Sequence, residues 1–113
     1  MKTTNLILVT IIAEDELESR LVADLKKLGT RGYTICRVRG EGAHGLRASE
    51  WEGENIKIEV IVDADIADAV GEHIANHYFP DFAIILYLQP VQVLREGKFI
   101  SPIKPDPASG SLH

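Results

Sequence analysis

The sequence has 113 residues, close to the commonest size of a single domain, which predicts one hydrophobic core. Seventeen acidic residues against twelve basic ones give a formal net charge of −5, which argues against nucleic acid or an anionic lipid surface as a partner. The single cysteine, Cys36, cannot form a disulfide within the chain and is expected to be a small core residue. No stretch approaches the roughly twenty apolar residues that cross a bilayer, so we expect a cytoplasmic protein without membrane insertion.

The first predicted strand spans residues 5–12, a run of mostly apolar and β-branched side chains. A helix should follow, because leucines and a valine fall on one helical face, with acidic residues before them and lysines after them, and Gly29 should end it. Two further strands are expected at residues 32–40 and 55–62. Residues 41–54 between them hold three glycines and four glutamates, and are predicted to form a mobile functional loop.

The second half of the chain predicts one more helix and one more strand. Ile66, Val70 and Ile74 recur every fourth residue after Asp63 and indicate a helix that ends before Pro80. An apolar run at residues 82–88 is the predicted fourth strand, and residues 91–94 could extend it past a proline at an edge position. The predicted domain covers residues 1–100, because residues 101–113 have the composition of a disordered tail.

The predicted order of elements is therefore βαββαβ. Folded as an antiparallel sheet with both helices on one face, this order gives an α+β, ferredoxin-like domain. One face of such a sheet has no helices over it, yet the first and fourth strands are apolar at the positions of both faces. We therefore expect other copies of the chain to cover the open face.

A search for catalytic or binding motifs gives two candidates. His73 and His77 lie four residues apart on the second predicted helix, a spacing that can hold zinc, but no third ligand is evident beside them. Gly40 and Gly42 form a G-x-G step at the end of a strand, where backbone N–H groups could approach a phosphate. A flexible loop start is the more frequent explanation of such a step on its own. No nucleophile elbow, P-loop or dinucleotide fingerprint occurs.

Several short motifs together carry a resemblance to a known family. The segments GYT at 32–34, RGEG at 39–42, NIKIE at 55–59 and GKF at 97–99, with Arg47, resemble the PII-like signalling proteins, especially the branch associated with carboxysomes and bicarbonate transport. The similarity runs from residue 6 to residue 99. It implies a homotrimer with three clefts between neighbouring subunits, each binding an adenine nucleotide of the AMP or ADP type.

The resemblance also implies which residues hold the phosphates of the nucleotide. Gly40 and Gly42 would cradle a phosphate through their backbone, and Arg47 would reach it from the loop. Arg95 and Lys98 are further candidates, because a guanidinium and an ammonium both complement phosphate charge.

The remaining site residues implied by the resemblance surround the nucleoside. Ile12 and Ala13 would line the pocket, while Thr34, Glu59 and Ile61 would contact the adenine from the neighbouring chain. A simpler role for Glu59 is an ion pair across strands with a base such as Arg37 or Arg39.

The expected function is regulatory and not enzymatic, without a resident cofactor. By resemblance, bicarbonate is a candidate second ligand, and a bicarbonate transporter or a carboxysome component is the candidate partner. Binding of 2-oxoglutarate is not expected, since His44 stands where nitrogen-regulatory relatives have a glutamine. The alternative is a small oligomeric ferredoxin-like enzyme or metal-binding protein, with a pocket formed between subunits by His44, His73, His77 and Glu59.

Overall fold

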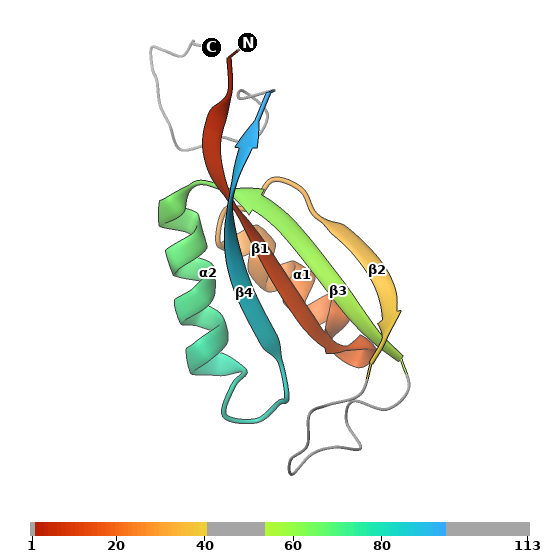
Figure 1. Cartoon of the computed structure of the whole chain (residues 1–113). Helices are drawn as coiled ribbons and strands as arrows, with labels where there is room; N and C mark the ends of the chain where they lie inside the picture. Colours follow the sequence, from red (N-terminus) through yellow and green to blue (C-terminus); the bar gives the residue numbers. More distant parts are fainter. Residues whose placement is uncertain (1, 41–53, 95–113) are drawn as a thin grey trace.

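The computed structural model describes residues 2–40 and 54–94 (Figure 1). Of the predicted loop at 41–54, residues 41–53 lie outside the described residues and Glu54 begins a strand; the tail, Gly42, His44, Arg47, Arg95 and Lys98 also lie outside. In chain order, the elements are β1 (Thr4–Glu14), a short 3₁₀ turn η1 (Asp15–Leu17), α1 (Glu18–Lys27), β2 (Thr34–Arg39), β3 (Glu54–Val62), α2 (Ala64–His77) and β4 (Ile85–Val93).

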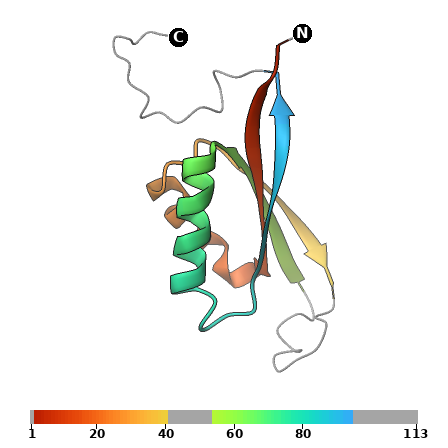
Figure 2. The same ribbon diagram turned by 60° about the vertical axis from the view of Figure 1, so that its left-hand side comes forward.

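The four strands form one sheet in the order β2-β3-β1-β4, and every neighbouring pair is antiparallel. Both helices lie on the same face of this sheet, which Figure 2 shows from the side. The predicted α+β, ferredoxin-like fold is therefore confirmed. No helix among the described residues is both long enough and apolar enough to span a bilayer.

The covered face of the sheet, against which the helices pack, holds the core. Cross-strand pairs such as Ile11 with Ile58 and Val9 with Val60 point to this face and are almost completely buried. Successive strand residues alternate between faces, so Thr10 and Glu59 point to the other face, which no described helix covers. The core residues are Val9, Ile11, Ala13, Leu17, Leu21, Leu25, Ile56, Ile58, Val60, Val62, Ala67, Val70, Ile74 and Tyr78.

Capping residues set the ends of the helices, and Gly29 ends the first helix as the sequence predicted. The Asp63 carboxylate accepts a hydrogen bond from the backbone N–H of Ile66 at 3.0 Å, which satisfies one of the free donors at the start of α2. Gly29 has a φ of 104° directly after α1, a conformation that residues with a Cβ rarely adopt. The Thr30 hydroxyl then donates to the Leu25 carbonyl at 3.0 Å and closes the helix end.

Two expectations from the sequence are wrong. The fourth strand begins at Ile85 and not at residue 82, because the backbone N–H groups of Asp81 and Phe82 both bond to the Tyr78 carbonyl and form a turn first. The strand then continues through Pro90 to Val93, at the edge of the sheet. Cys36 is exposed and is not a core residue, because β2 is the opposite edge strand and this side chain shares the open face with Lys57.

Candidate functional site

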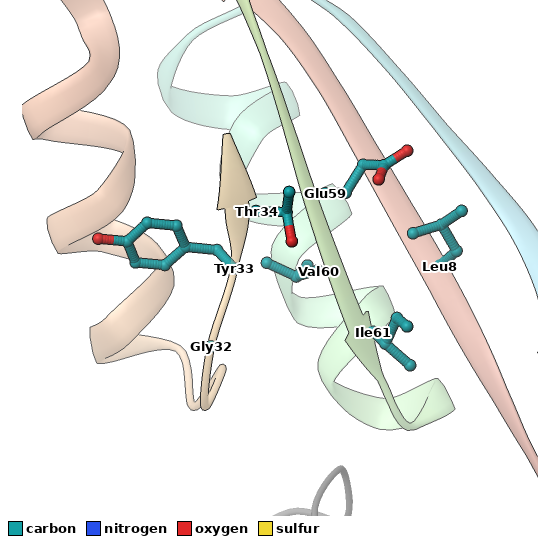
Figure 3. Close-up of a pocket in the computed structure, with 7 residues that line it drawn as sticks. All are labelled: Leu8, Gly32, Tyr33, Thr34, Glu59, Val60 and Ile61. Atoms are coloured by element: carbon teal, nitrogen blue, oxygen red, sulfur yellow. The ribbon is translucent and has the colours of Figure 1, made fainter. Parts of the chain in front are cut away.

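A hollow of about 350 Å³ lies on the open face of the sheet, where β2 begins beside β3 (Figure 3). Glu59 and Ile61 project from β3, Thr34 from β2 and Leu8 from β1. Gly32 has no side chain and contributes only backbone to the lining. The hollow therefore brings together Thr34, Glu59 and Ile61, the three residues that the sequence assigned to adenine. Its lining combines apolar side chains with one carboxylate and two hydroxyl-bearing residues, Thr34 and Tyr33, a composition that suits a planar heteroaromatic base.

The hollow is continuous with a polar row that crosses the whole open face. Thr34 lies opposite Glu59, Glu59 opposite Thr10, and Thr10 opposite Tyr87, so one residue of each strand takes part. The Thr10 hydroxyl is fully buried and has no hydrogen-bond partner among residues 2–40 and 54–94. The Glu59 carboxylate likewise makes no hydrogen bond or ion pair within the described part of the chain. These are groups that normally acquire a partner when a surface is buried.

The other predicted site residues that the structure describes lie along the sheet beyond this row. Ile12 is on the open face, beside Lys57 of β3 and Ile85 of β4. Ala13 is buried on the covered face. Gly40 follows the last residue of β2, and an added Cβ there would meet no described atom within 4 Å.

Gly40 is too far from the hollow to hold the same ligand within a single chain. It comes six residues after Thr34, which is about 20 Å along an extended strand, whereas Ile12 is only two residues from Thr10. A mononucleotide cannot reach from the hollow to Gly40 over this distance. If the hollow and Gly40 bind the same nucleotide, they must therefore come from two different copies of the chain.

The sheet end beside Gly40 also carries a network of three charged side chains. One guanidinium nitrogen of Arg37 lies 2.8 Å from a Glu54 carboxylate oxygen and 3.4 Å from an Asp15 carboxylate oxygen. Arg37 belongs to β2, Glu54 begins β3, and Asp15 follows β1, so the network joins the ends of three strands. Arg37 therefore pairs with these acids and not with Glu59, which was the alternative that the sequence left open for Arg37.

His73 and His77, the candidate metal ligands, lie on the covered side of the sheet. Nε2 of His73 is 2.9 Å from the Asp24 carboxylate, to which the Tyr78 hydroxyl also donates at 2.6 Å. The His77 ring stacks on the His73 ring, with 4.5 Å between centroids. Glu59 points to the opposite face, so a single chain does not assemble the proposed metal pocket. Within residues 2–40 and 54–94, no three histidine, cysteine, aspartate or glutamate side chains gather around one point.

The electrostatics of this helix network follow from its hydrogen bonds. Burial alone would raise the pKa of the Asp24 carboxyl, but the bonds from Tyr78 and His73 outweigh it and hold the pKa below its usual value. Burial, and then the bond to Asp24, raises the pKa of the Tyr78 hydroxyl above its ordinary range. The Arg20 guanidinium lies 4.4 Å from the centre of the Tyr78 ring and completes the network. These groups join α1 to α2 and have a structural role.

Comparison with known proteins agrees with this architecture. The family described as Nitrogen regulatory protein P-II matches residues 6–98. The chain belongs to this family. A PII-like signaling protein from Thermus thermophilus is 45% identical, with a TM-score of 0.75 over 88% of this chain and 99% of that one. The resemblance inferred from the short motifs is thus confirmed at the level of the family.

Two structures of CPII, a nitrogen regulatory PII-like protein from Thiomonas intermedia, are also similar to this P-II family member. CPII bound to ADP and bicarbonate is 26% identical, with a TM-score of 0.76 over 87% of this chain and 97% of that one. CPII bound to ADP, AMP and bicarbonate is 25% identical, with a TM-score of 0.70 over 83% of this chain and 98% of that one. Proteins of the P-II family have regulatory functions.

Sequence reasoning did not find the two charged networks. Asp15, Arg37 and Glu54 are separated by long stretches of chain, and only the strand register brings them together. The sequence did contain a signal for this network. A basic residue near the end of one strand and acidic residues at the ends of the neighbouring strands come together when the strands are correctly aligned. Asp24 and His73 gave no comparable signal, since their contact depends on how two helices pack.

Proposed function

We propose that the protein is a regulatory, non-enzymatic homotrimer that binds AMP or ADP in clefts between neighbouring copies. The observation that carries this proposal is the separation of Thr34 and Gly40, which lie at the two ends of β2. The hollow with Thr34 and Glu59 would receive the adenine, while Gly40 of the next copy would hold the phosphates and Ile12 of that copy would line the pocket. A cleft assembled in this way exists only in the oligomer, so nucleotide binding and assembly support one another.

The open face supplies the reason to assemble. Ile85 and Tyr87 are 46% and 43% exposed, although each lies in a regular strand. Leu8, Ile12 and Ile61 add further apolar surface beside them. Burying this surface against other copies would remove it from water, at about 25 cal/mol for each square ångström of apolar area. It would also offer the Thr10 hydroxyl a partner from another chain.

Bicarbonate is proposed as a second ligand, and a protein of inorganic-carbon uptake or of the carboxysome as the regulated partner. The support for bicarbonate is the CPII structure bound to ADP and bicarbonate, at 26% identity to this chain. Backbone N–H groups near Gly40 are suitable donors for a small oxyanion as well as for phosphate. The partner rests on the resemblance to the carboxysome- and transport-associated branch.

Calorimetric titration is the first test of ligand identity. AMP, ADP, ATP, cyclic AMP and 2-oxoglutarate would each be added with and without bicarbonate. We expect AMP and ADP to bind and 2-oxoglutarate to produce no heat beyond dilution. Mutual strengthening of ADP and bicarbonate binding would support a shared cleft. If no adenine nucleotide binds at millimolar concentration, the proposed function is wrong.

Mixing of two defective variants tests whether the cleft lies between copies. Glu59→Ala damages the adenine end, and Gly40→Ala places a methyl group where the backbone should meet phosphate. Neither should disturb the fold, because the Glu59 carboxylate has no bond within the described residues and the added Cβ of Gly40→Ala has space. Each variant alone should bind ADP weakly, whereas trimers reassembled from both should recover wild-type affinity in a minority of clefts. Two variants that never complement one another would place the whole site within one chain.

A further inference from the structure

The charged network of Asp15, Arg37 and Glu54 lies at the same sheet end as the proposed phosphate site. Asp15 comes two residues after Ala13, and Gly40 comes three residues after Arg37, which is about 10 Å along the strand. Both acids point their carboxylates at Arg37, at 3.4 Å and 2.8 Å. A phosphate bound at Gly40 would therefore lie near two negative side chains and one positive side chain.

We propose that Arg37 is a positioning residue that makes this sheet end acceptable to phosphate by neutralising Asp15 and Glu54. This inference rests on the proposed nucleotide site and concerns how that site tolerates its own acidic surroundings. With Arg37 present, the three side chains carry a summed charge of −1, and without it they carry −2. Arg37 acts through the two acids and does not itself touch the ligand.

The contacts favour this indirect role over a direct bond to phosphate. The guanidinium of Arg37 is already held by two carboxylates, and its residue occupies the register position opposite Ile56, on the covered face of the sheet. A direct phosphate contact would require the side chain to release both acids. The effect of Arg37 on nucleotide affinity should therefore depend on its distance from the phosphate, on the charge of the ligand and on the ionic strength, as expected for charges that interact through solvent.

The expected size of the effect follows from Coulomb's law. Removing one positive charge about 10 Å from a phosphate in water should weaken binding about fourfold for AMP and about eightfold for ADP at low ionic strength. Adenosine carries no charge and should bind equally well to the wild type and to Arg37→Ala. Raising the salt concentration until the Debye length falls to about 3 Å should remove most of the difference.

The experiment is a calorimetric series with adenosine, AMP and ADP on Arg37→Ala. Lys27→Ala is the matched control, because it removes one exposed positive charge at the opposite end of α1 from Asp15. We expect Arg37→Lys to retain wild-type affinity, since the charge is kept. We also expect Asp15→Asn with Glu54→Gln to restore nucleotide binding to Arg37→Ala, since no acid then needs neutralising.

The outcomes separate the inference from the proposed function. If the wild type binds ADP, and Arg37→Ala binds it equally well, the inference is wrong while the nucleotide site stands. If the acid substitutions do not rescue Arg37→Ala, Arg37 contacts phosphate directly and the indirect role is also wrong. A wild type that binds no nucleotide overturns the proposed function itself. Circular dichroism of every variant checks that the fold is intact, as expected for three exposed side chains.

Discussion

The two faces of the sheet are made by the same strands, but a single chain buries them and satisfies their polar groups to very different extents. On the covered face, Ile11 and Ile58 are fully buried against the helices, and the polar groups nearby are joined in the Asp24 network. On the open face, Ile85 and Tyr87 remain nearly half exposed, and the buried Thr10 hydroxyl lacks a bond within the described residues. An apolar strand pattern therefore does not show by itself whether its cover comes from the same chain or from another.

Placing a charge on the open face should have the largest effect. Ile85→Lys would bury an ammonium group in the proposed interface, where it has no partner, so trimers should not form. Each isolated subunit should keep its fold, because the side chain of Ile85 is already 46% exposed. Light scattering should give the mass of three chains for the wild type and of one chain for Ile85→Lys.

Phe79→Lys provides the control for this substitution. Phe79 is 48% exposed but lies in the turn that follows α2, where its backbone N–H bonds to the Ile74 carbonyl, and it is not part of the open face of the sheet. Phe79→Lys should therefore leave the trimer intact. If wild-type protein is monomeric at micromolar concentration, the open face is not an interface between copies.

A matched pair of alanine substitutions sharpens the same comparison. Ile11→Ala removes a fully buried side chain from the covered face and should lower the free energy of unfolding by about 2–5 kcal/mol. Ile85→Ala removes the same atoms from the open face, where the effect should act on association and grow as the protein is diluted. Urea unfolding at two protein concentrations distinguishes them. Equal, concentration-independent losses would argue that both faces are buried within one subunit.

The smallest expected effect concerns the network that joins the helices. Tyr78→Phe removes a hydrogen bond to a charged acceptor and should cost about 1–3 kcal/mol of unfolding free energy at neutral pH. Because the folded state lowers the pKa of Asp24, its contribution to stability is present above the ordinary aspartate value of 3.8 and is lost as the pH falls through the folded value. Without the Tyr78 bond, this loss of stability in acid should be smaller.

Urea unfolding between pH 2 and 7 measures this difference between the wild type and Tyr78→Phe. The control is Tyr87→Phe, which removes a hydroxyl from the open face, far from Asp24. Its acid profile should follow that of the wild type. Identical profiles for all three proteins would show that the Asp24 carboxylate gains nothing from Tyr78.

Local signals in the sequence were sufficient for most of the fold. The fourfold recurrence of Ile66, Val70 and Ile74, Gly29 as a helix end and the alternating apolar pattern of β3 each predicted a feature that the structure contains. The start of β4 could not be predicted, because residues 82–84 are apolar in either state and the turn depends on bonds to the Tyr78 carbonyl. Cys36 was misplaced for a related reason, since apolar alternation does not reveal which strand is at the edge.

The candidate site was predictable in part. Thr34, Glu59 and Ile61 came from a family resemblance, and the structure groups them around one hollow, although their role in binding stays a prediction. The separation of this group from Gly40 could not be recognised before the strand register was known. The Arg37 network depends on the same register, which is a long-range property that no local pattern encodes.

Pro90 has a consequence for how an apolar sheet of this kind avoids uncontrolled growth. The ladder between β1 and β4 continues past Pro90 to Val93, so the missing N–H group belongs on the free edge of the strand. Another strand that approached this edge would find an interrupted row of donors. Exposed edges without such interruptions template fibrous aggregates. Pro90 thus disfavours addition of a strand at this edge, where growth has no natural end, and leaves the open face as the surface for the proposed ring of copies.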